Sequence, residues 1–174
     1  MKHYLIVVDM QNDFIDGSLG TKEAEAIVGR VADRIRAFDG EVIFTRDTHG
    51  EDYPETLEGR NLPVVHCVKG SAGWQIREGL CEIRPCTVID KPSFGSTELG
   101  VLLAQRDLEE KIGSVTLVGL CTDICVISNA LLIKAFLPET PILVDAACCA
   151  GVTPGSHRGA LEAMKMCQIS IDNE

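Results

Sequence analysis

Residues 115–136 read VTLVGLCTDICVISNALLIKAF, in which an apolar strand segment and a helical segment follow each other directly. Residues 115–118 are predicted to form a strand, and residues 123–136 a helix that is apolar almost all round and therefore buried. An apolar strand without alternating polar residues, followed by a helix, is typical of a parallel sheet covered by helices. This stretch therefore predicts an α/β fold.

The same alternation of strand and helix extends along most of the chain. Further strands are predicted at 4–8, 41–45, 87–89, 142–144 and 168–171, and further helices at 21–38, 98–106 and 156–167. Residues 47–86 show little periodicity, and an irregular segment of that length is more often a functional loop region than an ordinary connection. We expect one three-layer domain over residues 1–174.

The composition narrows the partners that the chain can have. Its 174 residues include 26 Asp and Glu against 16 Lys and Arg, so the formal net charge is −10. This acidic balance argues against nucleic acid or an anionic membrane as a partner, because both bind basic faces. No apolar run has the length of a membrane span, and the N-terminus enters a strand without a signal peptide. We therefore expect a cytoplasmic protein whose eight cysteines stay reduced.

Candidate catalytic groups follow the predicted strands, at the sheet edge where α/β proteins bind ligands. Asp9 ends the first strand, Lys91 follows the third, and Cys125 lies in the first turn of the helix after the fourth. Helix amides would favour a thiolate at Cys125, Asp9 could accept its proton, and the charge of Lys91 would lower the pKa of both. Each side chain alone has a structural alternative, as a packing cysteine, a structural carboxylate or a surface lysine. Their placement on one edge favours a cysteine nucleophile.

A second group of side chains has the composition of a metal site. Asp47 and His49 follow the second strand, and His66 lies further along the irregular segment. One carboxylate and two imidazoles suit zinc, iron or manganese, with water or substrate completing the coordination. Spacing alone leaves open that these are ordinary loop residues.

Three motifs, in the order of the chain, resemble those of the isochorismatase-like cysteine hydrolases, the family that includes nicotinamidases. They are DMQNDF at 9–14, KPSFGS at 91–96 and GLCTDICV at 119–126. The resemblance implies a six-stranded, mostly parallel sheet in the order 3-2-1-4-5-6, with helices on both faces. It also implies a catalytic triad of Asp9, Lys91 and Cys125. A cis peptide between Leu120 and Cys121 is implied as well, with the amides of Cys121 and Cys125 forming an oxyanion hole.

The segments DTH at 47–49 and PVVHCVKG at 63–70 resemble the metal-binding motifs of the nicotinamidase branch. This likeness implies a divalent metal at Asp47, His49 and His66 that holds the pyridine nitrogen of the substrate. Zinc is the first choice, with iron or manganese as alternatives. Some members add a glutamate, for which Glu58 is the first candidate and Glu55 the second.

Two aromatic residues are candidates for the substrate pocket. Phe14 resembles the pocket phenylalanine that follows the first motif, and Trp74 would supply another wall. The chain departs from the nicotinamidases at LPVV, residues 62–65, where these enzymes often carry an aromatic residue that packs on the ring. This departure leaves the exact amide open.

The resemblance implies hydrolysis of nicotinamide, or of a related small carboxamide, to the acid and ammonia through a cysteine thioester, as part of NAD salvage. The resemblance also implies that the protein forms a homo-oligomer, either a dimer or a tetramer. A hydrolase of the same family with a different small substrate, such as isochorismate, is the main alternative. A binding or scaffold module would not need the three triad side chains. A thiol-redox protein is disfavoured, because Cys121 and Cys125 are spaced C-x-x-x-C, one residue longer than the usual motif.

Overall fold

Six segments of the chain form one open sheet in which every pair of neighbouring strands is parallel. The computed structural model describes residues 1–174. Its strands are β1 (Lys2–Val8), β2 (Glu41–Asp47), β3 (Thr87–Lys91), β4 (Ile112–Leu120), β5 (Ile142–Ala150) and β6 (Ser170–Asp172). They lie in the order β3-β2-β1-β4-β5-β6, which confirms the predicted fold class and strand order.

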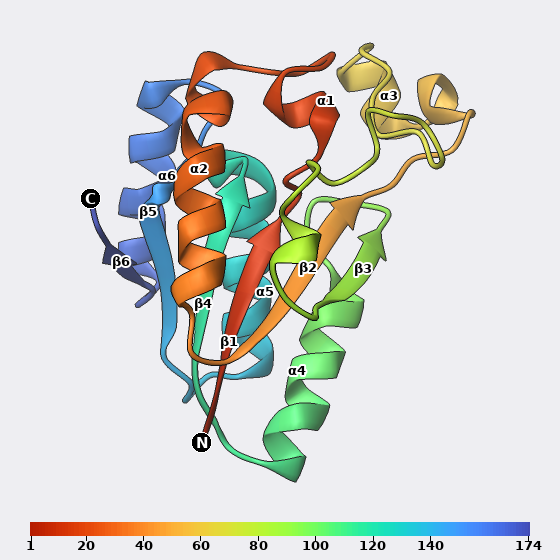
Figure 1. Cartoon of the computed structure of the whole chain (residues 1–174). Coiled ribbons are helices and arrows are strands. Elements are labelled where there is room, and N and C mark those ends of the chain that lie inside the picture. Colours follow the sequence, from red (N-terminus) through yellow and green to blue (C-terminus); the bar gives the residue numbers. More distant parts are fainter.

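Helices cover both faces of this sheet (Figure 1). The α-helices are α1 (Asn12–Ile15), α2 (Lys22–Ala37), α3 (Leu57–Asn61), α4 (Thr97–Glu109), α5 (Ile127–Phe136) and α6 (Pro154–Met166). α2 crosses the face seen at the front of Figure 1, and α4, α5 and α6 pack on the opposite face. None of the helices combines the length and the apolar character that a membrane-spanning segment needs.

β1 lies at the centre of the sheet, and its side chains alternate between two cores. Leu5 and Val7 pack with α2 on one face, while Ile6 and Val8 pack with the helices on the other. Because both faces of β1 are covered, its sequence is apolar without alternation, which is the pattern of a buried parallel strand. The same double coverage makes the end of β1 a buried place for a polar side chain.

The segment predicted as one helix at 123–136 is divided in the structure. Residues Thr122–Val126 form a π-helical turn, called the Cys125 turn below, and α5 follows directly. The prediction that this helix is buried all round is wrong, since Leu131 is 39% exposed and Phe136 is 37% exposed. α5 belongs to an outer layer, so only one of its faces packs on the sheet.

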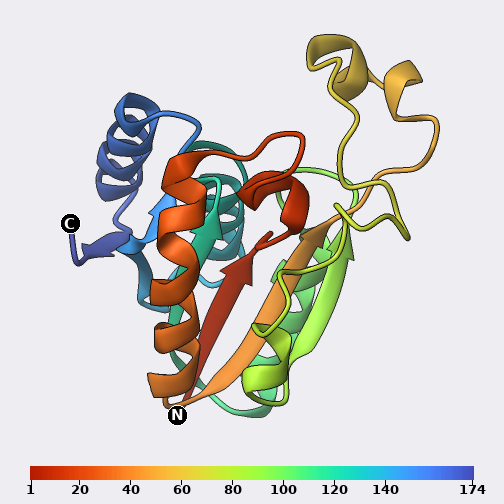
Figure 2. The ribbon, with the colours of Figure 1, turned by 45° about the horizontal axis from the view of Figure 1, so that its top comes forward.

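The long segment between β2 and β3 contains only short helical pieces, which are η1 (Tyr53–Glu55), α3 and η2 (Cys81–Ile83). Figure 2 shows its first part, with α3, projecting beyond the end of β2. Gly59 of α3 lies so close to the carbonyl oxygen of Tyr53 that a β carbon there would overlap it. A glycine therefore lets α3 fold back on Tyr53, and this sets the place of the neighbouring Glu58.

Candidate active site and metal centre

The carboxyl ends of β1, β2 and β3 bring three charged side chains to one edge of the sheet. Asp9 follows β1 directly, while Asp47 and Lys91 are the last residues of β2 and β3. Asp47 and Lys91 are also partners in the parallel ladder between these strands, so their side chains leave the sheet on the same face. All three side chains are buried, so their charges must be balanced within the protein.

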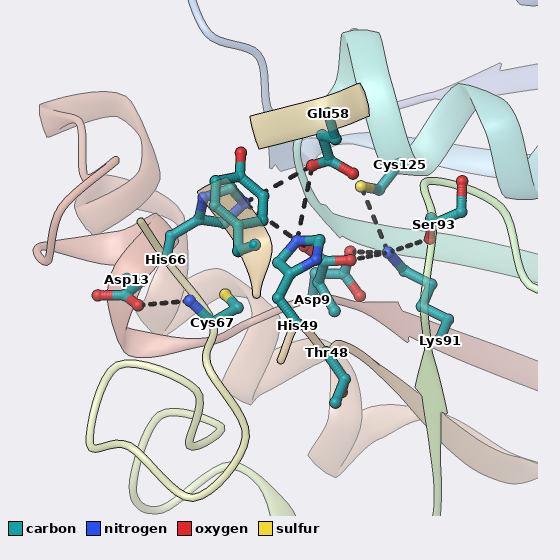
Figure 3. A network of polar contacts seen from close by, with 12 residues as sticks. Asp9, Asp13, Thr48, His49, Glu58, His66, Cys67, Lys91, Ser93 and Cys125 are labelled. Carbon is teal, nitrogen blue, oxygen red and sulfur yellow. Dashed lines mark hydrogen bonds and ion pairs between the residues drawn. The ribbon is translucent and has the colours of Figure 1, made fainter. Parts of the chain in front are cut away.

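The Lys91 ammonium is the centre of the polar contacts at this edge (Figure 3). Its Nζ lies 2.7 Å from Oδ2 of Asp9, 3.2 Å from Oδ1 of Asp47 and 3.5 Å from Sγ of Cys125. It also donates to the carbonyl oxygen of Ser93 at 3.0 Å. The structure thus brings together the three side chains of the predicted triad, and it adds Asp47 as a second carboxylate on the lysine.

Ion pairing keeps Lys91 charged in spite of its burial. Burial lowers the pKa of Lys91, but its negative neighbours, Asp9 first among them, raise it more, and the net shift is upward. Burial raises the pKa of the Asp9 carboxyl, and the charge of Lys91 opposes only part of that shift. Oγ1 of Thr45 also donates to Oδ1 of Asp9 at 2.7 Å, which favours the ionised carboxylate. Asp9 is therefore a stronger base than an ordinary aspartate.

The surroundings of Cys125 favour the protonated thiol over the thiolate. Burial raises its pKa well above the ordinary value, Asp9 raises it further, and Lys91 lowers it only in part. The loss of water around the sulfur thus opposes the effect that the helix amides were expected to have on the thiol. Deprotonation requires a base, and of the two carboxylates on Lys91, Asp9 lies nearer to the ammonium that also contacts the sulfur.

The Cys125 turn is tightly folded at its start. A cis peptide joins Leu120 to Cys121, as the resemblance implies. The carbonyl oxygen of Cys121 accepts the N–H groups of Ile124 at 3.1 Å and Val126 at 3.0 Å. Burial raises the pKa of the Cys121 thiol to about 12, so this side chain stays protonated. Cys121 therefore has its backbone amide, and not its thiol, to offer to a reaction.

Four side chains converge next to the triad, with one donor atom from each lying within 4.8 Å of all the others. They are Asp47, His49, Glu58 and His66, called the four-donor group below. Nε2 of His49 lies 2.9 Å from Oδ2 of Asp47. Oε1 of Glu58 lies 3.6 Å from Nε2 of His49 and 3.8 Å from Nε2 of His66. Glu55, the second candidate glutamate, is exposed in η1 and lies outside the group.

The donor atoms of this group fit a divalent metal. Nδ1 of His66 lies 2.7 Å from the carbonyl oxygen of Val64. A carbonyl can only accept, so Nδ1 carries a proton, and Nε2 is the ring nitrogen that faces the two carboxylates and could bind a metal. Burial raises the pKa of Asp47, but its polar neighbours His49, His66 and Lys91 together lower it more, so Asp47 is ionised. Two imidazoles and two carboxylates are a donor set typical of zinc, iron or manganese.

Two residues of the N-terminal motif support this group and are not among the predicted site residues. Gln11 is fully buried and its Oε1 accepts the N–H of Asp47 at 2.7 Å. Its Nε2 donates to the carbonyl oxygens of Asp47 at 2.8 Å and Trp74 at 2.9 Å. Oδ2 of Asp13 accepts the N–H of Cys67 at 2.7 Å, in the loop that carries the second histidine. The sequence pattern that could have identified both residues is their position shortly after a buried strand.

Tyr53 is another site residue that no sequence motif singles out. It is buried, and its ring centroid lies 4.6 Å from that of His49 and 4.9 Å from that of His66. Its hydroxyl donates to the carbonyl oxygen of Leu62 at 2.9 Å. The ring therefore packs against both imidazoles and restricts their orientation. In the sequence, Tyr53 is only an aromatic residue shortly after His49 in an irregular segment. That pattern is too common to identify a site residue.

A cavity of about 210 Å³ has both Cys125 and part of the four-donor group in its walls. It is lined by Phe14, Leu19, Thr21, Asp47, Glu58, Leu62, His66, Phe94, Cys121, Ile124, Cys125 and Val152. Most of these side chains are apolar. Cavities for drug-sized ligands measure about 300–1,000 Å³, so this one suits a single ring with a small substituent.

The two predicted substrate contacts have different positions. Phe14 lines the cavity, with its ring centroid 5.5 Å from that of His66. Trp74 does not line it. Its Nε1 donates to Oγ1 of Thr48 at 2.9 Å, and the guanidinium carbon of Arg46 lies 3.4 Å from the ring centroid. These contacts hold the indole against β2 and the residue after it, so other apolar residues form the second wall.

Known proteins resemble this chain over almost its whole length. A family model described as "Isochorismatase domain" matches residues 3–174. A nicotinamidase/pyrazinamidase from Mycobacterium tuberculosis is 29% identical over 181 residues, which cover 96% of this chain and 96% of that protein. The crystal structure of a pyrazinamidase from Pyrococcus horikoshii in complex with zinc has a TM-score of 0.82 at 30% identity and covers 98% of each chain. A nicotinamidase/pyrazinamidase structure from Bacillus subtilis has a TM-score of 0.82 at 25% identity, covering 98% of this chain and 99% of that one.

Proposed function

The chain belongs to the isochorismatase family, and we propose that it hydrolyses nicotinamide, or a related carboxamide on a small nitrogen-containing ring, to the acid and ammonia. The observation that carries the proposal is that one ring-sized cavity has Cys125 and members of the four-donor group in its walls. The relatives named nicotinamidase or pyrazinamidase support the same substrate class. Nicotinamide hydrolysis gives the protein a role in NAD salvage.

Catalysis begins with transfer of the Cys125 proton to Asp9. The Lys91 ammonium contacts both side chains, so the negative charge moves from the carboxylate to the sulfur without leaving its counter-ion. The thiolate attacks the carbonyl carbon, a C–S bond forms, and the electron pair of the C=O bond moves to the oxygen. The backbone amides of Cys121 and Cys125 stabilise this oxyanion.

The tetrahedral intermediate then collapses to a thioester. Asp9 gives its proton to the amide nitrogen, the C–N bond breaks, and ammonia leaves. Water next loses a proton to Asp9 and attacks the thioester, and the released sulfur recovers that proton. The raised pKa of Asp9 suits a group that both accepts and donates a proton in each half of the reaction.

Asp47, His49, Glu58 and His66 would hold a divalent metal, with zinc as the first choice and iron or manganese as alternatives. When bound, such an ion supplies a Lewis-acid site for the ring nitrogen of the substrate. The apolar walls around Phe14 exclude water from the ring and leave the carboxamide next to Cys125. Family resemblance further supports a cytoplasmic homo-oligomer, a dimer or tetramer, as the working form.

Ammonia release from nicotinamide tests the proposal. The wild-type protein should form nicotinate and ammonia in equal amounts, and Cys125→Ala should lose activity by several orders of magnitude. Cys148→Ala is the matched control, because it removes another buried thiol that lies outside the cavity. A Cys125→Ala variant that releases ammonia at the wild-type rate contradicts the mechanism.

A substrate panel separates the candidate substrate classes. Nicotinamide, pyrazinamide and benzamide share a carboxamide, but benzamide has no ring nitrogen, and isochorismate can release no ammonia. Nicotinamide and pyrazinamide should be hydrolysed faster than benzamide. Turnover of isochorismate alone would assign the chain to another branch of its family.

A further inference from the structure

The Cys125 turn is held by α6 through a side-chain hydrogen bond. Nδ1 of His157, in the first turn of α6, lies 2.7 Å from Oγ1 of Thr122. Thr122 is fully buried and is the first residue of the turn, directly after Cys121. Neither His157 nor Thr122 takes part in the proton transfers of the proposed mechanism. Their contact nevertheless joins α6 to the segment that carries the thiol.

The position of His157 is fixed by the start of α6. Thr153 and Ser156 form a capping box, in which each side-chain oxygen accepts the backbone N–H of the other residue, at 3.0 and 3.1 Å. A β carbon at Gly151 would lie 2.9 Å from Cα of His157, closer than such atoms approach. The glycine therefore lets the chain after β5 pass against His157, which sets the ring beside the turn.

A second hydrogen bond from the same segment reaches the next residue of the turn. The N–H of Val152 lies 3.1 Å from Oδ1 and 3.2 Å from Oδ2 of Asp123. Thr122 and Asp123 are thus both tied to residues 152–157. Val152 also lines the cavity. The segment that restrains the turn is therefore continuous with the wall of the substrate site.

The hydrogen bond also gives the buried Thr122 hydroxyl a partner. Burial lowers the pKa of His157, so the ring is neutral near pH 7. A neutral imidazole has one N–H and one lone-pair nitrogen, and a hydroxyl can donate and accept, so the two groups can hydrogen-bond in either tautomer of the ring. A buried hydroxyl without a partner is costly, so the contact favours one position of the turn relative to α6.

We propose that His157 is a positioning residue for the oxyanion site: through its hydrogen bond with Thr122, it holds the Cys125 turn so that the amides of Cys121 and Cys125 point at the developing oxyanion. This inference rests on the proposed function. Loss of the contact should lower kcat about 10-fold to 100-fold, because amides that shift slightly still donate but with poorer geometry. KM should stay the same, because neither His157 nor Thr122 lines the cavity.

Single and double variants test the contact. His157→Leu and Thr122→Val remove the hydrogen bond, and both should lower kcat with KM unchanged. His157→Asn should recover most of the wild-type kcat, because its amide can accept from or donate to the Thr122 hydroxyl, and Thr122→Ser keeps that hydroxyl. The double variant with His157→Leu and Thr122→Val should be no slower than the slower single variant, since both changes remove one interaction.

Two further measurements separate positioning from a general loss of structure. Each variant is assayed well below its midpoint of thermal unfolding, and alkylation of Cys125 reports on the thiol independently of the oxyanion amides. Wild-type kcat in His157→Leu, a rise in KM in place of the loss of kcat, or no recovery in His157→Asn would overturn the inference. A wild-type protein that releases no ammonia from any amide contradicts the proposed function, and the inference with it, before any variant is compared.

Discussion

Nζ of Lys91 lies 3.2 Å from Oδ1 of Asp47, while the other oxygen of that carboxylate lies 2.9 Å from Nε2 of His49. Asp47 therefore belongs both to the sheet edge that carries Asp9 and Lys91 and to the four-donor group. The two parts of the candidate site form one buried polar network, and groups linked in this way respond to changes in each other.

Glu58→Ala should weaken zinc binding at least about 10-fold, because it removes one of the converging donors and leaves the rest of the group in place. Competition against a chromophoric chelator measures the affinity. Glu55→Ala is the matched control, since Glu55 is an exposed carboxylate of the same loop outside the group. An equal loss in both variants would assign the effect to the charge of the loop and not to ligation.

Thr45→Val should move the acid limb of the pH–rate profile to higher pH by about one unit. Asp9 must be ionised to accept a proton, so activity is present above its pKa and is lost as the pH falls through it. Burial already raises that pKa, and the hydrogen bond from Thr45 opposes the rise. A hydrogen bond to a charged group is worth about 1.5–3 kcal/mol, and one pKa unit corresponds to about 1.4 kcal/mol.

Measurement of kcat/KM between about pH 4 and pH 8 locates this limb in the free enzyme. Thr45→Ser keeps the hydroxyl donor and should leave the limb where it is in the wild type. If Thr45→Val has the wild-type limb, Asp9 is not the base that the profile reports.

Iodoacetamide should modify Cys125 more slowly than Cys167 at pH 7, and its rate at Cys125 should rise steadily with pH. Cys167 is exposed, whereas Cys125 is buried and burial raises its pKa. Only the thiolate reacts, and below the pKa its fraction grows about tenfold per pH unit. Mass spectrometry of the labelled peptides follows each site separately. A rate at Cys125 that stays constant with pH would instead indicate a thiolate formed in the resting protein.

Phe14→Leu should raise KM for nicotinamide, while Trp74→Phe should leave it unchanged. Phe14 lines the cavity and Trp74 does not. Trp74→Phe removes the hydrogen bond to Thr48, so it should instead lower the free energy of unfolding by about 1 kcal/mol. Steady-state kinetics and urea unfolding give the two quantities. An equal rise in KM for both variants would indicate that the indole of Trp74 contacts the substrate after all.

The placement of the triad side chains at one edge of the sheet could be predicted from sequence, because it follows from where the strands end. Buried parallel strands are apolar runs, so the first polar residue after each run marks a carboxyl end. Asp9 is predicted in this way, and Lys91 is the second polar residue after the third run, next to Asp90. Cys125 needed one more inference, that its helix follows a strand of the same sheet. The residue types of Asp47, His49 and His66 suggest a metal site, but their spacing is not specific, and the motif resemblance is what favours ligation over an ordinary loop role.

The cavity walls could not be predicted, because they depend on the path of irregular segments. Leu62 and Phe94 line the cavity from segments without hydrophobic periodicity, where no pattern indicates which way a side chain points. Trp74 comes from a similar segment, and its contact with Arg46 directs it elsewhere. The exposure of Phe136 on α5 follows from the layer that the helix occupies, which its own composition does not reveal.

Because the parallel ladder pairs Asp47 with Lys91, the register of β3 against β2 determines where the Lys91 side chain lies. β3 is an edge strand and has β2 as its only neighbour, so its register is the least constrained at this end of the sheet. Because side chains alternate along a strand, a slip of one residue would turn Lys91 to the opposite face. A single insertion or deletion within β3 would then leave six strands but no ammonium between Asp9 and Cys125. The contacts of the buried ammonium therefore stabilise one register of β3, since they exist in that register only.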